Sequence, residues 1–246
     1  MKSLRFAHDA NLKFPLQEEG WKELFLRFAV ESVGYDDMGQ LTEALVAHQF
    51  TTAFLPAANC YYLRKDPLYQ GVGIALIGHK QEAHFKSLLV VKKGSGIESW
   101  NQLQGKRLAY VHRYCTSSYF APALLIARQG ASIHAFFSQM VVVEAWQKQI
   151  DAVLEGKADA TMVMEEVWMN NAKNSETTQV IDEIDNLPAP VILMSREADP
   201  AWHREFLTTL LRPPTQPVKE ALFSGFAPYP DQMIASFFKK AEKALR

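Results

Sequence analysis

The chain has 246 residues, with 26 lysines and arginines against 27 aspartates and glutamates, so its net charge is −1. This balance argues against a nucleic-acid partner held by bulk charge, and we expect none. Hydrophobic residues make up 48% of the chain and aromatic residues 11%. That is ample material for a hydrophobic core and excludes a disordered or fibrous protein.

No stretch approaches the roughly 18 apolar residues of a membrane-spanning helix, and residues 1–14 lack the apolar core of a secretory signal. We therefore expect a soluble protein. Its expected location is the periplasm or the cell surface if a signal peptide has been removed, and the cytoplasm if the sequence is complete.

The cysteines and histidines show no metal-binding pattern. Cys60 and Cys115 are too few for a disulfide framework and lack the paired Cys/His spacing of a zinc site. The seven histidines form no i, i+4 pair and no cluster with cysteine. We expect free thiols, no metal and no cofactor.

Short β-rich runs alternate with amphipathic helices along the chain. Strands are predicted at residues 4–8, 51–55, 72–77, 87–92, 107–111, 140–144, 160–164 and 191–194, and helices at 21–28, 41–48, 57–64, 117–129 and 146–156. In the first helix, Trp21, Leu24, Phe25 and Phe28 follow the i, i+3, i+4, i+7 rule, which indicates one buried face. Beyond residue 194 only helices are predicted, with a rigid surface turn at residues 212–219.

Strands separated by helices indicate parallel sheets with right-handed crossovers. Two such series predict an α/β fold with two lobes, each a mostly parallel sheet flanked by helices. Lobe 1 comprises residues 1–89 and 194–246, and lobe 2 comprises residues 90–193, with hinge strands near 88–92 and 190–194. A cleft between the lobes is the expected ligand site.

The most informative stretch is residues 106–130, where a predicted strand ends in Cys115, Thr116, Ser117 and Ser118 and a helix begins at once. The N–H groups of a helix's first turn lack intrahelical acceptors, so hydroxyls and amides together form a ready anion site. The helix dipole adds about 0.3–1 kcal/mol. The alternative is an ordinary Ser/Thr N-cap, which stabilises the helix by about 1 kcal/mol and binds nothing.

Two further features carry alternatives. Glu165 and Glu166 follow a predicted strand; one carboxylate is expected to bind a ligand ammonium, or both belong to a solvated first helical turn. Cys115 at a helix N-terminus, with His112 three residues upstream, favours an enzyme hypothesis with a thiolate nucleophile. Against it stands a buried, inert thiol.

Several segments resemble periplasmic solute-binding proteins of the phosphonate, phosphite and phosphate type. Residues 87–111 resemble the family's lobe-crossing segment, and Cys115-Thr-Ser-Ser-Tyr119 with Pro122 resembles its Ser-Thr-Ser-Gly-Tyr anion loop. Residues 52–58 (TAFLPAA), 150–160 (IDAVLEGKADA), 165–168 (EEVW) and 187–193 (LPAPVIL) agree in the same order. The resemblance spans nearly the whole chain.

The resemblance implies a type II periplasmic-binding fold whose two lobes close on a small oxyanion and deliver it to an ABC permease. It implies a monomer without catalytic activity. Thr116 and Ser117 match the hydroxyl donors of the family, whereas Cys115 and Ser118 replace a Ser and a Gly. The ligand contacts expected on this basis are Asp9, Pro56, Phe85, Cys115, Thr116, Ser117, Ser118, Tyr119, Trp146 and Glu165.

Two of these positions depart from the family. Phe85 stands where a Tyr is usual, and Trp146 stands where many members have a His. Both changes replace a polar contact by apolar surface, so the ligand is expected to differ from the usual phosphonate. The alternative functions are a cytoplasmic enzyme on the same fold, resembling menaquinone-pathway dehydratases, and a sensory domain of a larger receptor.

Overall fold

The computed structural model describes residues 4–78, 80–212 and 222–245, and the chain divides into two compact units. Unit 1 holds the chain up to Ala83 and from Ala189 to Met233, and unit 2 holds His84–Pro188 and the chain from Ile234 onward. Each unit contains one sheet flanked by helices. The predicted class, two α/β units, is confirmed.

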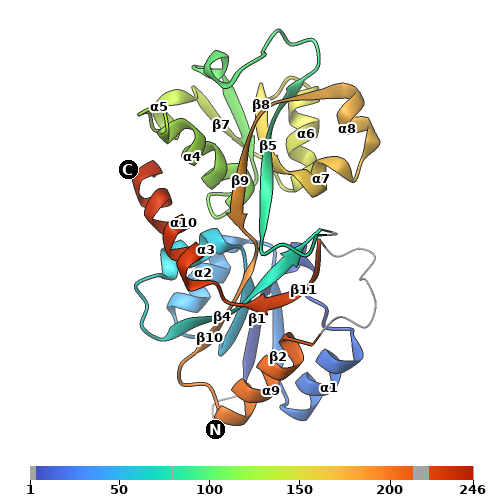
Figure 1. Ribbon diagram of the computed structural model, residues 1–246, viewed down its shortest axis with the longest axis vertical. Coiled ribbons are helices and arrows are strands. Elements are labelled where there is room, and N and C mark those ends of the chain that lie inside the picture. Colours follow the sequence, from blue (N-terminus) through green and yellow to red (C-terminus); the bar gives the residue numbers. More distant parts are fainter. Residues whose placement is uncertain (1–3, 79, 213–221, 246) are drawn as a thin grey trace. The chain divides into compact units, whose positions relative to one another are not determined.

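Unit 1 has a six-stranded sheet in the order β11-β4-β10-β3-β1-β2. Its strands are β1 (Arg5–Asp9), β2 (Glu31–Tyr35), β3 (Thr52–Leu55), β4 (Tyr69–Ile77), β10 (Val191–Ser195) and β11 (Phe223–Pro228). Its helices are η1 (Ala10–Leu12), α1 (Glu19–Arg27), α2 (Met38–Val46), α3 (Ala57–Leu63) and α9 (Pro200–Leu210). Figure 1 shows α1 beside α9 and α2 beside α3.

Aromatic side chains dominate the core of unit 1. The Phe6 ring on β1 lies 4.8 Å from that of Phe14, and Trp21 on α1 lies 5.2 Å from Phe206 on α9. Trp202 is fully buried, and its indole N–H donates to Thr52 Oγ1 over 3.0 Å. The pair satisfies the polar atoms that burial takes from water. The predicted buried face of the first helix is confirmed by Trp21, which is buried in this core.

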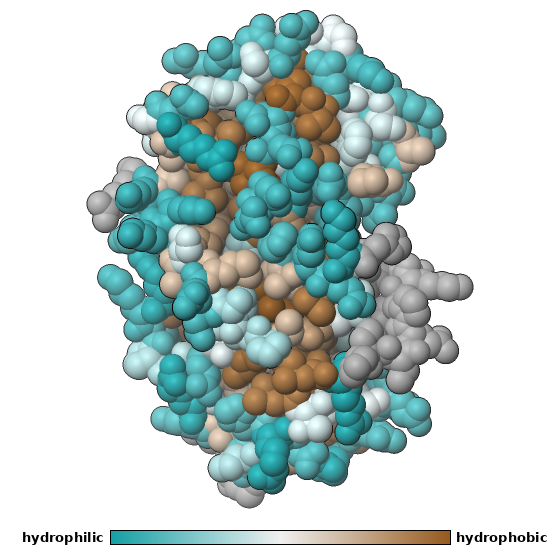
Figure 2. All heavy atoms as spheres, viewed as in Figure 1, coloured by the Kyte–Doolittle hydropathy of each residue, from teal (hydrophilic) through white to brown (hydrophobic). Residues whose placement is uncertain are grey.

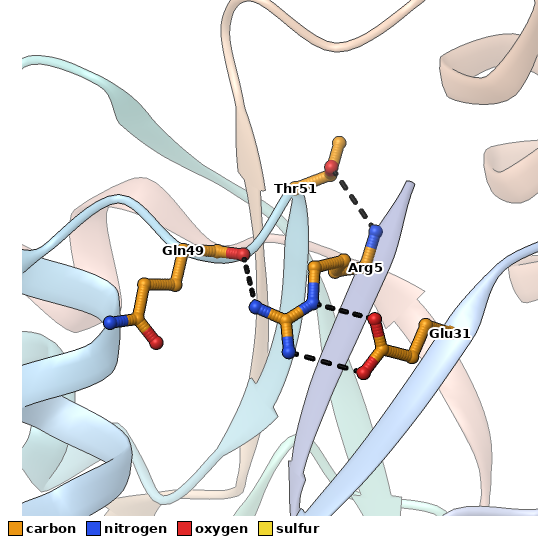
Figure 3. A network of polar contacts seen from close by, with 4 residues as sticks. All are labelled: Arg5, Glu31, Gln49 and Thr51. Carbon is orange, nitrogen blue, oxygen red and sulfur yellow. Dashed lines mark hydrogen bonds and ion pairs between the residues drawn. The ribbon is translucent and has the colours of Figure 1, made fainter. Parts of the chain in front are cut away.

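A polar network ties the start of β1 to its neighbours, as Figure 3 shows. The Arg5 guanidinium donates to both carboxylate oxygens of Glu31 on β2, over 2.9 and 3.2 Å, and to the Gln49 carbonyl over 3.3 Å. The Arg5 amide donates to Thr51 Oγ1 over 3.4 Å. Two-pronged carboxylate pairing of this kind fixes geometry more than it adds stability at an exposed site.

Unit 2 has a five-stranded sheet in the order β7-β6-β8-β5-β9. Its strands are β5 (His84–Lys92), β6 (Arg107–Tyr110), β7 (Gln139–Val142), β8 (Ala160–Met164) and β9 (Thr178–Pro188). Its helical segments are η2 (Trp100–Leu103), η3 (Thr116–Phe120), α4 (Ala121–Ala127), α5 (Ile133–Phe136), α6 (Trp146–Leu154), α7 (Glu165–Met169) and α8 (Ala172–Thr177). In Figure 1, α4 and α5 lie on one side of this sheet and α6 to α8 on the other.

The last helix, α10 (Asp231–Ala244), has most of its residues in unit 2. Its Phe237 ring lies 5.7 Å from the ring of Phe120, which is fully buried. This packing differs from the predicted lobe 1 at 194–246. The unit boundaries also fall at 83/84 and 188/189, whereas the sequence placed them at 89/90 and 193/194.

Both sheets are mixed, which corrects the expectation of mostly parallel sheets. In unit 1, β1 pairs in parallel with β2 and β3, but β10, β4 and β11 join in antiparallel fashion. In unit 2, β6 pairs in parallel with β7 and β8, but β5 pairs antiparallel with β8 and β9. The reason is that the strands carrying the chain out of a unit and back into it, such as β4 and β10, run side by side in opposite directions.

Three strands were not expected from the sequence. β2 and β9 lie at sheet edges, where charged residues such as Glu31 and Asp182 hide the apolar alternation of a strand. The prediction of a purely helical tail is wrong, because β11 pairs with β4 and its Phe223 ring packs 5.3 Å from Phe54. Residues 213–219 of the predicted surface turn lie outside the described residues.

Charged and polar side chains cover most of the face shown in Figure 2, and apolar side chains come to the surface in smaller areas. Among the described residues, no helix is both long enough and apolar enough to cross a membrane.

Candidate functional site

The residues of unit 2 that the sequence predicts to contact a ligand gather at one edge of its sheet. β6, β7 and β8 are neighbours and parallel, so their carboxyl ends meet at the same edge. The turn at residues 111–118 leaves β6 there, Trp146 begins the helix after β7, and Glu165 directly follows β8. Crevices at the carboxyl ends of parallel strands are where α/β proteins bind ligands.

Residues 115–118, the hydroxyl run, start a continuous helical segment at this edge. Cys115 has extended backbone angles and acts as the N-cap, with its Sγ accepting from the Ser118 N–H over 3.4 Å. Residues Thr116–Phe120 form a π-helical turn that runs directly into α4. A π turn is rare and is frequently found at functional sites. The predicted helix start is therefore confirmed, with a different local geometry.

Short side chains bind the turn together. Ser118 Oγ accepts from the Val111 N–H over 3.2 Å, and Cys115 Sγ lies 3.3 Å from Ser117 Oγ. Ser87 Oγ, on β5, donates to the Ser117 carbonyl over 3.1 Å. The four residues of the run are all buried, with Ser118 fully so. The run is thus a packed structure and more than a solvated helix cap.

The electrostatics of the turn suit a negative charge. The helix dipole places partial positive charge at the N-terminus of the segment. Arg113, two residues before Cys115, adds a full positive charge; its guanidinium lies 5.0 Å from the centre of the Tyr114 ring and donates to Tyr114 Oη over 2.7 Å. Amides, hydroxyls and a nearby guanidinium together can hold an oxyanion.

Tyr119, which directly follows the hydroxyl run, is turned toward α5. Its hydroxyl lies 3.0 Å from His134 Nε2, and its ring lies 5.6 Å from that of Tyr110. Burial raises the pKa of Tyr119, and the positive charge of Arg113 partly offsets this. The Tyr119 hydroxyl therefore already has a hydrogen-bond partner within unit 2.

Glu165 stands close to a cation of its own unit. Lys86 Nζ forms an ion pair with Glu183 over 2.9 Å, and this hydrogen bond raises the pKa of Lys86, with a smaller contribution from the negative charge of Glu165. The expected role of Glu165 as the partner of a ligand ammonium must therefore compete with Lys86.

The two apolar departures occupy different positions at the same edge. Phe85 is buried and precedes Ser87 by two residues on β5, and alternate residues of a strand share a face. Since Ser87 contacts the turn, Phe85 lies on the face of β5 that meets it. Trp146 is half-buried at the first position of α6.

In unit 1, the two expected residues Asp9 and Pro56 also share a sheet edge. β1 ends at Asp9, and Pro56 follows β3, which is its parallel neighbour. Asp9 is only 2% exposed, and its carboxylate accepts from the Asn11 N–H over 2.9 Å. Burial raises the pKa of Asp9 to about 6. The hydrogen bonds from Asn11 lower this pKa in part, and the nearby negative charge of Asp36 raises it.

Sequence reasoning did not single out Ser87 or Arg113. Ser87 is a polar residue that directly precedes the apolar run 88–91 of β5 and is fully buried, a combination that signals a specific hydrogen bond. Arg113 stands between a strand end and a hydroxyl run, where a basic residue is a recognisable mark of an anion site.

Comparison with protein families finds one match. Residues 22–229 match the family described as "ABC transporter, phosphonate, periplasmic substrate-binding protein". The match covers the greater part of both units. No curated protein sequence matches the chain.

Solved structures of the same fold cover nearly the whole chain. XAC2383 from Xanthomonas citri, bound to ATP, has a TM-score of 0.80 at 15% identity and covers 98% of this chain and 97% of its own. PhnD1 from Prochlorococcus marinus in complex with methylphosphonate has a TM-score of 0.74 at 14% identity, covering 98% and 97%. A binding protein component of an ABC phosphonate transporter (PA3383) from Pseudomonas aeruginosa has 0.74 at 12%, covering 97% and 87%. At these identities the likeness shows the fold.

The raised pKa of Asp9 predicts a pH-dependent stability. The folded protein holds this proton more tightly than the unfolded chain, in which the pKa is 3.8. Stability from Asp9 is therefore fully present below pH 4 and is lost as the pH rises through about 6. Relative to Asp9→Asn, wild type should lose about 3 kcal/mol of unfolding free energy across this range, at about 1.4 kcal/mol per pKa unit.

Urea unfolding at a series of pH values measures this difference. Asparagine keeps the oxygen that accepts from Asn11, and the comparison cancels the opposite effect of His8, whose pKa is lowered by burial. Asp37→Asn, which changes an exposed N-cap aspartate of the same unit, controls for removal of a charge. Parallel stability curves for wild type and Asp9→Asn would contradict the prediction.

Proposed function

The chain belongs to the phosphonate-binding family of periplasmic ABC-transporter substrate-binding proteins, and we propose that it binds a small phosphorus oxyanion at the turn between β6 and α4. The observation that carries this proposal is the convergence of donors in residues 111–118. Hydroxyls of Thr116 and Ser117 and the first-turn amides lie at one helix start, and Arg113 stands two residues before its N-cap. Such a start binds phosphate-like groups without a buried lysine.

The ligand carries a phosphoryl group with an apolar substituent. Methylphosphonate and ATP, the ligands named for two proteins of the same fold, share phosphoryl oxygens. In this chain Phe85 and Trp146 supply apolar surface at the same sheet edge as the turn. Apolar surface of this kind rewards a substituent that inorganic phosphate lacks.

Binding, without chemistry, is the proposed activity. The Cys115 thiol already serves as the acceptor for the Ser118 N–H and lies beside Ser117 Oγ, which is the work of a structural N-cap. We assign to the protein a monomeric state, a periplasmic location and delivery of its ligand to the membrane permease of an ABC transporter, in keeping with the family.

Removing the two hydroxyl donors should weaken ligand binding. Thr116→Ala/Ser117→Ala is expected to cost roughly 2–5 kcal/mol of binding free energy for methylphosphonate, at about 1.5–3 kcal/mol for each hydrogen bond to a charged group. Isothermal titration calorimetry measures the difference. Ser132→Ala, which removes the N-cap hydroxyl of α5 in the same unit, is the control and should bind like wild type.

Equal affinity of wild type and the double variant would remove the turn from the proposal. Binding of ATP but of neither methylphosphonate nor phosphate would keep the turn and change the ligand to a nucleotide.

The apolar departures predict an order of ligands. Methylphosphonate and phenylphosphonate should raise the melting temperature more than inorganic phosphate does at equal concentration, because a ligand stabilises the folded state in proportion to its affinity. Trp146→His should narrow this difference by restoring a polar side chain. A larger shift with bare phosphate than with either phosphonate would show that Phe85 and Trp146 do not line the ligand.

The structural role of Cys115 predicts that a hydroxyl can replace the thiol. Cys115→Ser should keep or slightly increase oxyanion affinity, since a hydroxyl forms stronger hydrogen bonds than a thiol. Calorimetry gives the affinity, and prolonged incubation of wild type with the bound anion, followed by phosphorus NMR, tests for chemistry. A product formed by wild type and absent with Cys115→Ser would establish an enzyme and overturn the binding role.

A further inference from the structure

The carbonyl groups at the start of the π turn accept hydrogen bonds from amides further along the helix, but the Ser117 carbonyl does not. The Cys115 carbonyl accepts from the amides of both Tyr119 and Phe120, over 3.2 and 3.1 Å. The Thr116 carbonyl accepts from the Ala121 amide, five residues on. Continuing this spacing, the donor for the Ser117 carbonyl would be residue 122.

Residue 122 is a proline, which has no N–H. The Ala121 amide, which would serve the Ser117 carbonyl in an ordinary α-helix, donates to Thr116 instead. Ser117 is only 4% exposed, and a buried carbonyl without a donor is strongly disfavoured. The helix itself therefore supplies no donor to this carbonyl.

The missing donor comes from another strand. Ser87 is fully buried on β5, and its hydroxyl lies 3.1 Å from the Ser117 carbonyl oxygen and 3.4 Å from that of Val163. Its one hydrogen thus has the Ser117 carbonyl as its nearer acceptor. Ser87 stands 30 residues earlier in the chain than Ser117, so the contact exists only in the folded unit.

We propose that Ser87 is a positioning residue for the oxyanion turn: its hydroxyl replaces the amide that Pro122 lacks and so holds Thr116 and Ser117 in the π geometry. Without it, the lowest-cost repair is a return of the Ala121 amide to the Ser117 carbonyl, which winds the turn as an α-helix and redirects the donors. This inference rests on the proposed function for its effect on affinity, but not for its effect on the turn.

Calorimetry with methylphosphonate and with inorganic phosphate tests the proposal. Ser87→Ala should bind about tenfold or more weakly than wild type, as expected when a hydrogen bond that orders a charged ligand's donors is lost. Ser87→Thr, which keeps the hydroxyl, should restore most of the affinity. Ser87→Cys, close in size but a weaker donor, should fall between, and it serves if Ser87→Ala does not fold.

Pro122→Ala provides a second, independent readout. It restores an N–H at position 122, so it should change affinity little in wild type but recover affinity in the Ser87→Ala background. Thr161→Val is the matched control: Thr161 is also fully buried, and its hydroxyl lies 2.9 Å from Gln149 Oε1 and 3.0 Å from the carbonyl oxygen of Ala109 in the same sheet. It should lower stability and leave affinity unchanged.

The amide NMR signals of Thr116–Phe120 report the turn directly. They should shift in Ser87→Ala, shift little in Thr161→Val, and return toward their original positions when Pro122→Ala is added. Wild-type affinity in folded Ser87→Ala or Ser87→Cys, or an equal loss of affinity in Thr161→Val, would overturn the inference. If wild type binds methylphosphonate, phosphate and ATP all without measurable affinity, the proposed function fails, and the amide signals alone decide whether Ser87 holds the turn.

Discussion

Buried amide and carbonyl groups must be hydrogen-bonded, and this requirement governs the turn that follows β6. The backbone of residues 111–118 cannot satisfy all of its own amides and carbonyls. The chain passes there from a strand into a helix through a π turn, and Pro122, which follows the turn, has no N–H to donate. Ser118 serves the Val111 amide, Cys115 serves the Ser118 amide, and Ser87 serves the Ser117 carbonyl. All three of these side chains are short and buried.

The same constraint explains why the candidate site has partial charges inside the turn and a full charge only on an exposed residue. A buried lysine or arginine would pay a large desolvation cost before any ligand arrived. Hydroxyls and amides carry partial charges only, so they can be buried in advance and still attract an anion. The full charge of Arg113 stays on an exposed residue beside the turn, where water continues to solvate it.

Sheet topology decides which side chains meet. Parallel neighbours bring the ends of β6, β7 and β8 to one edge of unit 2 and the ends of β1 and β3 to one edge of unit 1. β5, antiparallel to β8, starts where β8 ends, because Ser87 pairs with Met164. That antiparallel entry is what brings Phe85 and Ser87 to the carboxyl edge, so the mixed character of the sheet contributes directly to the candidate site.

The sequence by itself determined the features that depend on neighbouring residues. The apolar periodicity around Trp21 predicted a buried helix face, the run from Cys115 to Ser118 predicted a helix start, and the order of motifs indicated the family. The anion-binding role of that run stays a prediction. The buried helix face follows from local geometry, because residues three or four apart on a helix share a face. The edge strands β2 and β9 escaped prediction because their solvent-facing charges obscure the apolar alternation.

Only the tertiary structure decided the contacts between distant segments. β11 forms a strand because it pairs with β4. Most of α10 belongs to unit 2, where Phe237 packs against Phe120. The sequence likewise does not predict the partner of the Ser117 carbonyl. Pro122 shows that the helix lacks a donor, but no neighbouring residue indicates which side chain supplies one. Pairings of this kind are chosen by the whole fold, which sets residues 30 positions apart within hydrogen-bonding distance after the strands have assembled.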